Sequence, residues 1–286
     1  MGRMSGAYWQ QVHADGLAVP TDRPLDELTA ELTRMLGDPD PQLRDRTAYP
    51  TLTTWVDRGV YDDLLAGLGD GMAVGLGVGL GEQGTDTVFR RSFSALVLGE
   101  CIARDNRRTL LPGGKILEWG DRLATWILRE RDLRGFIPGK GWAHAIAHGA
   151  DALATLARSP HLATAELTVI LDVIADRVLL PVDEPFTHGE PDRLAFASME
   201  VLRRNVVPLR VLEPWVVRLA ASARGRSSYR ERDSYLVGGN AEAYLRALHL
   251  QLSLAPHPPQ QRSDLLLVVL DALKKTNAAY LGPTGE

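Results

Sequence analysis

The sequence predicts an all-α fold without a sheet, organised as an irregular α-solenoid of helical hairpins. Apolar residues recur at intervals of three and four almost everywhere, which is the period of an amphipathic helix. The breaks between these segments are short and rich in glycine and proline, which favours antiparallel neighbours. Alternating runs of β-branched residues are missing, apart from the short Val206-Val207 pair. Roughly a dozen helices are more than one bundle core usually organises, so a solenoid is favoured over a closed bundle.

The N-terminal segments have recognisable helix ends. A helix over residues 25–36 follows the start signal Asp22–Pro24 and ends at Gly37. Residues 36–52 combine an acidic-proline turn with an arginine, a small residue and a leucine, and they resemble the first helix of a HEAT-type repeat. Pro50 is expected to kink this helix, because proline lacks the backbone N–H and its ring collides with the preceding turn.

The glycine-rich segment 71–81 predicts a helix end or a connector between helices. Each glycine weakens a regular helix by about 1 kcal/mol relative to alanine. A phosphate-binding loop would need Gly-Lys-Ser/Thr after the glycines and a strand before them, and the sequence shows neither. The segment is also shorter than the roughly 20 apolar residues that cross a membrane, so we expect no membrane partner.

The same period predicts helices through the rest of the chain. They are a helix capped by Thr85 or Asp86, one around residues 117–128, and helices over 141–158, 162–180, 211–223, 241–254 and 265–280. Asn240 is expected to cap the helix over 241–254. We expect one domain over residues 1–286, with any subdivision near residues 181–187.

Length, charge and cysteine content exclude several classes of protein. The chain has 286 residues and is 45% hydrophobic, which excludes low-complexity disorder. Its net charge of −4 argues against a nucleic-acid partner, which usually requires a basic surface. Cys101 is the only cysteine, so no disulfide forms within the chain, and we expect a cytoplasmic protein without a secretory signal.

The most informative stretch is the helix predicted after the Gly/Pro turn near Gly141. At 100° per residue, His144, His148 and Asp151 share one face of this helix. Two imidazoles and a carboxylate at this spacing suit a divalent zinc or iron ion. Two alternatives remain open: the stripe is the solvated face of an amphipathic helix, or Asp151 hydrogen-bonds a partly buried His148.

A second polar cluster lies at the start of a later helix. His188, Glu190 and Asp192 occur within five residues, where Pro191 and both carboxylates also suit a helix N-terminus. If the two clusters converge, His188 becomes a further metal ligand and Glu190 a general base acting on bound water. The ligand-binding residues expected around this pocket are Lys140, Trp142, Asp192 and Arg193.

Nucleophilic and anion-binding sites are less well supported. Cys101 lies among apolar residues and is interpreted as a core residue. Ser92 and Ser94 lie inside a helix, without the Gly-x-Ser-x-Gly pattern of a nucleophile elbow. Arginine pairs such as Arg90-Arg91 are interpreted as solvated or ion-paired, because neighbouring helical residues point about 100° apart.

Several of these segments resemble a known family. Asp86-Thr-Val-Phe-Arg-Arg-Ser-Phe-Ser, the stretch from Arg134 to Asp151, His188-Gly-Glu-Pro-Asp-Arg-Leu-Ala and Tyr244-Leu-Arg-Ala-Leu are similar to the bacterial family catalogued as domain of unknown function 2785. The resemblance implies a small, cytoplasmic, all-helical protein and implies no activity, substrate or catalytic residue.

Two classes of function therefore remain. The first is a helical-repeat binding or scaffold protein that presents the polar pocket to a protein or small-molecule partner. The second is a metal-dependent hydrolase or oxygenase that uses the same residues. Ala145 stands where the glutamate of a His-Glu-x-x-His motif would be, so the zincin class is excluded.

Overall fold

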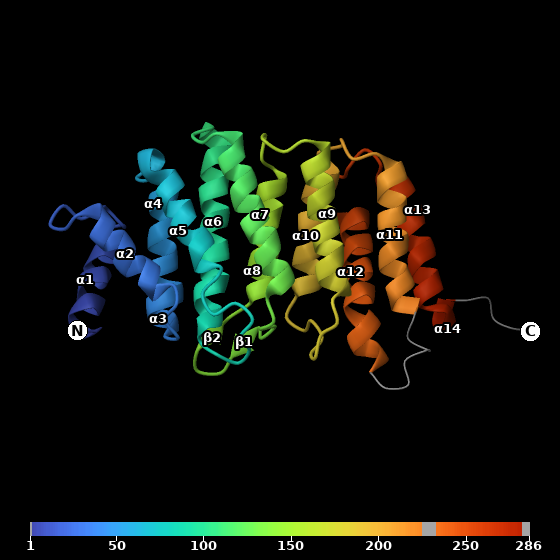
Figure 1. Cartoon of the computed structure of the whole chain (residues 1–286), viewed down its shortest axis with the longest axis horizontal. Coiled ribbons are helices and arrows are strands. Elements are labelled where there is room, and N and C mark those ends of the chain that lie inside the picture. Colours follow the sequence, from blue (N-terminus) through green and yellow to red (C-terminus); the bar gives the residue numbers. More distant parts are fainter. Residues whose placement is uncertain (1, 225–232, 282–286) are drawn as a thin grey trace, which may run out of the picture. The chain divides into compact units, whose positions relative to one another are not determined.

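The structure is a computed structural model that describes residues 2–224 and 233–281. The chain divides into two compact units, Met1–Ala152 and Leu153–Glu286. The boundary falls inside a helix, and the subdivision expected near residues 181–187 lies within the second unit. Within each unit the described residues are mainly helical (Figure 1), which confirms the all-α prediction.

The first unit begins with short helices and continues with longer ones. Its helices are α1 (Gly2–Ala14), α2 (Leu25–Met35), α3 (Pro41–Leu43), α4 (Tyr49–Asp57), α5 (Leu65–Gly75), α6 (Thr87–Arg108) and α7 (Gly113–Arg129), and α8 (Ala145–Ala157) starts here and crosses into the second unit. A short 3-10 turn over Asp62–Leu64 precedes α5. Helix α6 packs against α4, α5 and α7, so it forms the centre of this unit.

The second unit contains α9 (Thr164–Leu179), α10 (Glu190–Arg203), α11 (Leu209–Arg224), α12 (Ser234–Leu254), α13 (Arg262–Thr276) and α14 (Ala278–Leu281). Two expectations need correction. The helix predicted over 265–280 is interrupted at Asn277, and the helix predicted to start at Asn240 already starts at Ser234. Asn240 is therefore a buried residue inside α12 and not its N-cap.

The prediction of no sheet is wrong at one place. Strands β1 (Phe136–Ile137) and β2 (Gly141–Trp142) form an antiparallel hairpin, with Phe136 paired to Trp142. The turn between them has proline at its second position and Gly139 at its third, where φ is +77°, and Lys140 N donates to Ile137 O at 3.0 Å. This is the pattern of a type II turn, which needs glycine at the position of positive φ. The Pro-Gly pair was the signal for it.

Pro50 lies in the first turn of α4, and the helical turn in front of it is wider than an α-helical turn. A π-helical segment, Arg44–Ala48, lies between α3 and α4, and the backbone N–H of Tyr49 donates to the carbonyl of Arg44, five residues earlier. Pro50 cannot donate to Arg46, and its ring needs room beside that carbonyl. The wider turn in front of Pro50 provides this room.

Tryptophans and close-packed glycines organise the core of the first unit. Trp55, Trp119 and Trp126 are buried. A Cβ on Gly69 would lie 2.1 Å from the ring of Trp119, so only glycine fits where α5 crosses that indole. Helix α5 ends at Gly75 and is followed by a turn, which confirms the interpretation of the glycine-rich segment as a helix end and connector.

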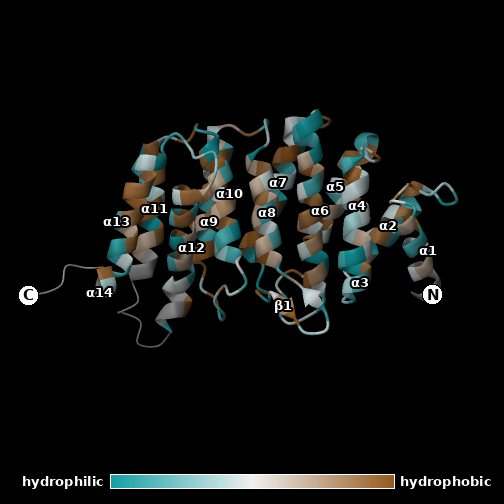
Figure 2. Cartoon of the chain, turned by 180° about the vertical axis from the view of Figure 1, so that it is seen from behind, coloured by the Kyte–Doolittle hydropathy of each residue, from teal (hydrophilic) through white to brown (hydrophobic). Residues whose placement is uncertain are grey.

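Hydrophobic and hydrophilic residues alternate along the helices of both units (Figure 2), as the period of the sequence requires. Among the residues that the structure describes, no helix is long and apolar enough to span a membrane.

Candidate functional site

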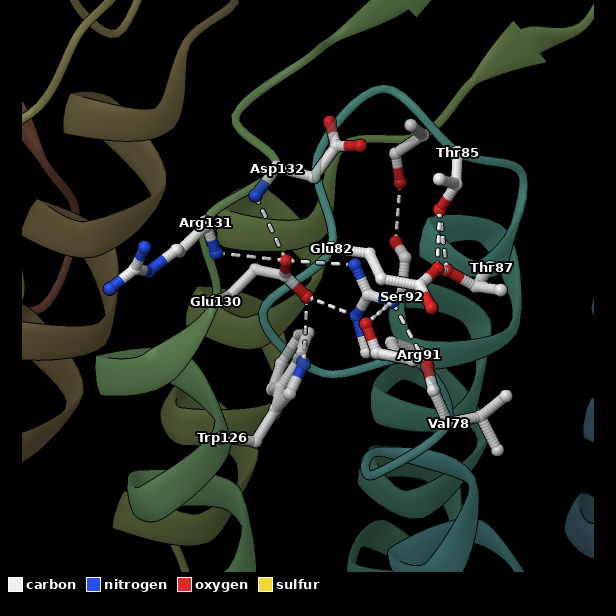
Figure 3. Close-up of polar contacts among 12 residues, drawn as sticks. Val78, Glu82, Thr85, Thr87, Arg91, Ser92, Trp126, Glu130, Arg131 and Asp132 are labelled. Carbon is white, nitrogen blue, oxygen red and sulfur yellow. Dashed lines mark hydrogen bonds and ion pairs between the residues drawn. The ribbon is translucent and has the colours of Figure 1, made fainter.

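The segment between α7 and α8, residues 130–144, carries the hairpin and is anchored by a buried ion pair. Arg91 of α6 donates to Glu130 through two parallel hydrogen bonds, Nε to Oε2 at 2.6 Å and Nη2 to Oε1 at 2.9 Å (Figure 3). Both side chains are completely buried. A bidentate arginine–carboxylate pair is the strongest ion-pair geometry available to side chains.

The remaining polar atoms of this pair are also satisfied. Arg91 Nη1 donates to the carbonyls of Val78 and Gly79, each at 2.9 Å. Glu130 Oε2 accepts from the indole N–H of Trp126, and Oε1 accepts from the backbone N–H groups that follow it in the chain (Figure 3). The pair thus fastens the glycine-rich connector of α5 and the start of segment 130–144 to the same point of α6.

Two further ion pairs hold the segment along its length. Asp132 is buried, pairs with Arg134 at 2.7 Å and accepts from the backbone N–H of Gly84 at 3.0 Å. Near the hairpin turn, Lys140 pairs with Asp86, the residue before α6, at 2.6 Å. The expected ligand-binding residue Lys140 therefore has a structural partner.

Arg44, in the π-helical segment before α4, contacts the turn of the hairpin. Its guanidinium is fully buried, donates to the carbonyl of Lys140 at 2.6 Å and pairs with Asp45 at 2.8 Å. It also lies over the ring of Phe89, 3.9 Å from the centroid, which adds a cation–π contact. Burial lowers the pKa of Arg44, and burial also raises the pKa of Asp45, with Arg44 opposing that rise.

The hairpin exposes two aromatic side chains. Phe136 is 51% exposed and Trp142 is 44% exposed, and their rings meet edge to face at 5.2 Å. One face of Trp142 is stacked on the His144 ring, 4.5 Å between centroids and 25° between planes. The Phe136 and Trp142 rings are thus packed edge to face, with their planes 71° apart, and the Trp142 ring is in turn packed on His144.

His144 and His148 do not share a helix face in the way predicted. His144 lies before α8 with a φ of +52°, and its carbonyl accepts from the N–H of His148 at 2.9 Å, so His144 is where the helix begins. The solvated-face interpretation is wrong for both histidines, which are 9% and 8% exposed. The opposite face, with Ile146 and Ala150, is buried as predicted.

His148 is surrounded by groups that sequence reasoning did not connect with it. Its Nδ1 lies 2.7 Å from the hydroxyl of Ser92, and its ring meets Phe93 edge to face at 5.2 Å. The His144 and His148 rings are 5.8 Å apart between centroids. Asp151 is half-buried one turn further along α8. Over residues 2–224 and 233–281, no group of three or more His, Cys, Asp or Glu is arranged to hold a metal ion.

The second predicted cluster belongs to the other unit. Glu190 is buried at the first position of α10, and its Oε2 accepts from the backbone N–H of His188 at 2.8 Å. Gly189 precedes it with a φ of +84°. The side chains of His188, Asp192 and Arg193 are exposed. Glu190 and Asp192 lie in the first turn of α10, as expected for carboxylates at a helix N-terminus. The role of Glu190 as a general base stays a prediction, as does the convergence of the two clusters.

The sequence analysis missed the central roles of Arg44, Arg91 and Glu130. Arg91 was interpreted as solvated or ion-paired; it is fully buried and ion-paired, and its partner lies 39 residues away on another element. Glu130 precedes a loop that contains both acidic and basic residues, and no sequence motif around it indicated a buried partner. Cys101 is fully buried and burial raises its pKa, which confirms the interpretation of this residue as part of the core.

The comparisons with known proteins give one family. The model of a family described as "Protein of unknown function (DUF2785)" matches residues 76–250. No curated protein and no solved structure matches the chain. The matched range starts at the glycine-rich connector and includes the whole anchored segment 130–144.

Proposed function

Because the chain belongs to the DUF2785 family of proteins of unknown function, its activity has to be inferred from its own residues, and we propose that it is a helical-repeat binding or scaffold protein. In this proposal the β1–β2 hairpin of the first unit is the recognition surface. The partner is a protein or a small molecule, and the proposed compartment is the cytoplasm, since the only cysteine is buried and reduced.

The packing of helices within each unit supports a HEAT-like repeat arrangement. In stacked helical hairpins, a helix packs on the next helix along the chain and on the one after that. Within the first unit α5 packs on α6 and α7, and α4 packs on α6. Within the second unit α9 packs on α10 and α11, α10 packs on α12, and α11 packs on α13.

The observation that carries the proposal is the exposure of two adjacent aromatic rings on an immobilised hairpin. Loops are normally the mobile part of a domain, and binding residues concentrate on loops that a rigid scaffold positions. Here three buried charged side chains, Arg44, Arg91 and Glu130, fix the hairpin and its approach. When a partner binds, exposed tryptophan and phenylalanine side chains bury a large apolar area and lose little side-chain entropy, which suits them to binding.

A photo-crosslinking experiment in cells tests the proposal. A photoreactive phenylalanine analogue replaces Phe136 on the hairpin, and a second protein carries it at Leu117, a 41% exposed residue of α7. We expect discrete adducts from position 136 and none from position 117. Adding Trp142→Ala should remove the adducts, because the aromatic ring next to position 136 is lost.

Two outcomes contradict the proposal. One is the absence of any adduct at position 136 under conditions where the analogue reacts with added test peptide. The other is an adduct pattern that is the same at positions 136 and 117, which would indicate unspecific surface contacts. Circular dichroism and thermal unfolding of both proteins serve as folding controls.

A further inference from the structure

The second unit has a small cavity between helices α9 and α11. Its volume is about 200 Å³. Two buried residues, Leu171 and Trp215, line its inner part, and Val211 and Pro214 add apolar surface nearer the solvent. Cavities that enclose a drug-sized molecule measure roughly 300–1,000 Å³. This cavity therefore takes one short apolar chain or a single side chain, and it is too small for a cofactor.

The hydrogen-bond donors that line the cavity are already engaged within the protein. The indole N–H of Trp215 donates to the carbonyl of Leu171 at 3.0 Å. The guanidinium of Arg218 makes a short ion pair with Asp176 and a longer one with Asp172, at 3.6 Å. Two carboxylates thus share the charge of Arg218, so the cavity does not favour an anionic ligand.

The acceptors that line the cavity keep capacity for a ligand. The side chain of Asp172 is 55% exposed, and its 3.6 Å separation from Arg218 is too long for a hydrogen bond. The hydroxyl of Thr168 gives its only proton to the carbonyl of Thr164 at 2.8 Å, so its oxygen presents lone pairs. A ligand that donates hydrogen bonds fits these two side chains.

A proline in the wall adds a backbone acceptor. Pro214 lies inside α11, and it has no N–H for the carbonyl of Arg210, four residues earlier. That carbonyl belongs to the same turn of α11 as Val211 and Pro214, which both line the cavity. The helix therefore leaves one carbonyl beside the cavity without its usual α-helical donor.

We propose that this cavity binds an alkylammonium group, that is, a primary amine on a short unbranched apolar chain. The chain packs on Leu171 and Trp215, and the ammonium, which has three donors and no acceptor, binds Asp172 and Thr168. Two carboxylates against one guanidinium give this rim a net negative charge, which favours a cation. Free aliphatic amines and lysine side chains of a partner share this chemistry. The site belongs to the second unit and is independent of the hairpin proposal.

Titration of wild-type protein with n-pentylamine, followed by ¹H–¹⁵N correlation spectra, tests the site. The indole N–H of Trp215 is the reporter, and Trp215→Phe identifies its signal among the six tryptophans. We expect a saturable shift of this signal with n-pentylamine. Pentanoate, an anion of the same chain length, should bind at least 5-fold more weakly, which is about 1 kcal/mol of charge preference.

Two pairs of variants separate the cavity from the rest of the surface. Val211→Phe fills the cavity and should abolish the shift, whereas Val217→Phe, at a 56% exposed position of the same helix outside the cavity, should bind like wild type. Asp172→Asn removes the carboxylate charge and should weaken n-pentylamine binding by about 3- to 5-fold. Asp264→Asn, at an exposed position of α13, makes the same change in net charge and should have no effect.

Three results would overturn the proposal. They are a Trp215 signal that n-pentylamine does not shift, equal binding of pentanoate and n-pentylamine, and equal binding by the Val211→Phe and Val217→Phe proteins. A last titration distinguishes the sources of the amine. If Nα-acetyl-lysine methylamide shifts the same signal, the cavity accepts a lysine side chain of a partner; if only n-pentylamine does so, it accepts a free amine.

Discussion

Two segments that connect helices look alike in sequence and differ in how the structure holds them. Residues 130–144 lead into α8 and residues 180–189 lead into α10, and both contain proline, glycine, histidine and acidic residues. The first is fixed by the buried Arg91–Glu130 pair and by Arg44. The second is fixed by backbone N–H groups, Phe186 to Asn240 Oδ1 at 2.9 Å and His188 to Glu190 at 2.8 Å.

The difference lies in the kind of buried contact: the first segment is held by a buried ion pair, whereas the buried Glu190 holds the second by accepting from a backbone N–H. Burying an ion pair requires that both charges keep complete hydrogen bonding, and replacing such a pair with apolar residues often costs nothing. A buried pair is therefore weak evidence of added stability and better evidence of a fixed position. In the first unit that fixed position belongs to a hairpin with exposed aromatic rings. In the 180–189 segment, the hydroxyl of Thr187 lies 2.9 Å from Nδ1 of His188.

The largest effect is expected from breaking the buried pair. Glu130→Gln keeps the shape of the side chain but leaves the Arg91 charge buried without its counter-charge, so the free energy of unfolding should fall by about 3–5 kcal/mol. Urea unfolding followed by circular dichroism measures it. Asp192→Asn, an exposed carboxylate of α10, is the control and should change stability by less than about 0.5 kcal/mol. A loss of unfolding free energy below about 1 kcal/mol for Glu130→Gln would mean that the buried ion pair does not hold residues 130–144 more firmly than backbone contacts hold residues 180–189.

A smaller loss is expected from Arg44→Met. Methionine keeps the apolar stem but loses the hydrogen bond to Lys140 O and the cation–π contact with Phe89, which together contribute about 2–3 kcal/mol. The effect should be local: amide hydrogen exchange should accelerate at Lys140 and Ala143 and stay unchanged at Phe186. Equal acceleration in both segments would show that Arg44 stabilises the protein generally and does not act on the hairpin.

The sequence was sufficient for the helices because their period and their Gly/Pro ends are local signals. The helix over 25–36 was predicted to end at Gly37 and another helix to cover 162–180; α2 ends at Met35 and α9 at Leu179. The site was only partly predictable. His144 and His148 were identified from their spacing and Trp142 as an expected ligand-binding residue, but the residues that hold this region come from α6 and from the π-helical turn.

The part of the site that the sequence did not predict depends on contacts between residues far apart in the chain. Arg44 meets the Lys140 carbonyl across 96 residues, and Ser92 meets His148 across 56. Nothing in the local pattern around Arg44 or Ser92 indicates such a partner. His144 was misplaced for a related reason: its left-handed backbone follows from the hairpin that precedes it, and helical periodicity assumes a continuous helix.

In the second segment, Asn240→Ala should have a modest effect. It removes the acceptor for Phe186 N–H, which contributes about 1 kcal/mol, but it also removes Asn240 Nδ2, a buried donor without a hydrogen-bond partner. The two effects oppose one another, so the net loss of stability should be below about 1 kcal/mol. A loss comparable with that of Glu130→Gln would mean that residues 180–189 are anchored as firmly as the hairpin.

The smallest effect is expected at His188, and a neighbouring variant makes it informative. His188→Ala keeps the backbone N–H that Glu190 accepts, and the side chain is exposed, so the change in unfolding free energy should stay within about 0.5 kcal/mol. Gly189→Ala changes only the next residue but forces a Cβ onto a φ of +84°, which costs about 1–2 kcal/mol. If the backbone holds this turn, the glycine variant must be the more damaging of the two. A larger loss of thermal stability for His188→Ala than for Gly189→Ala would mean that the His188 ring itself holds the turn. Both segments would then be held by side chains, and they would differ only in how strongly.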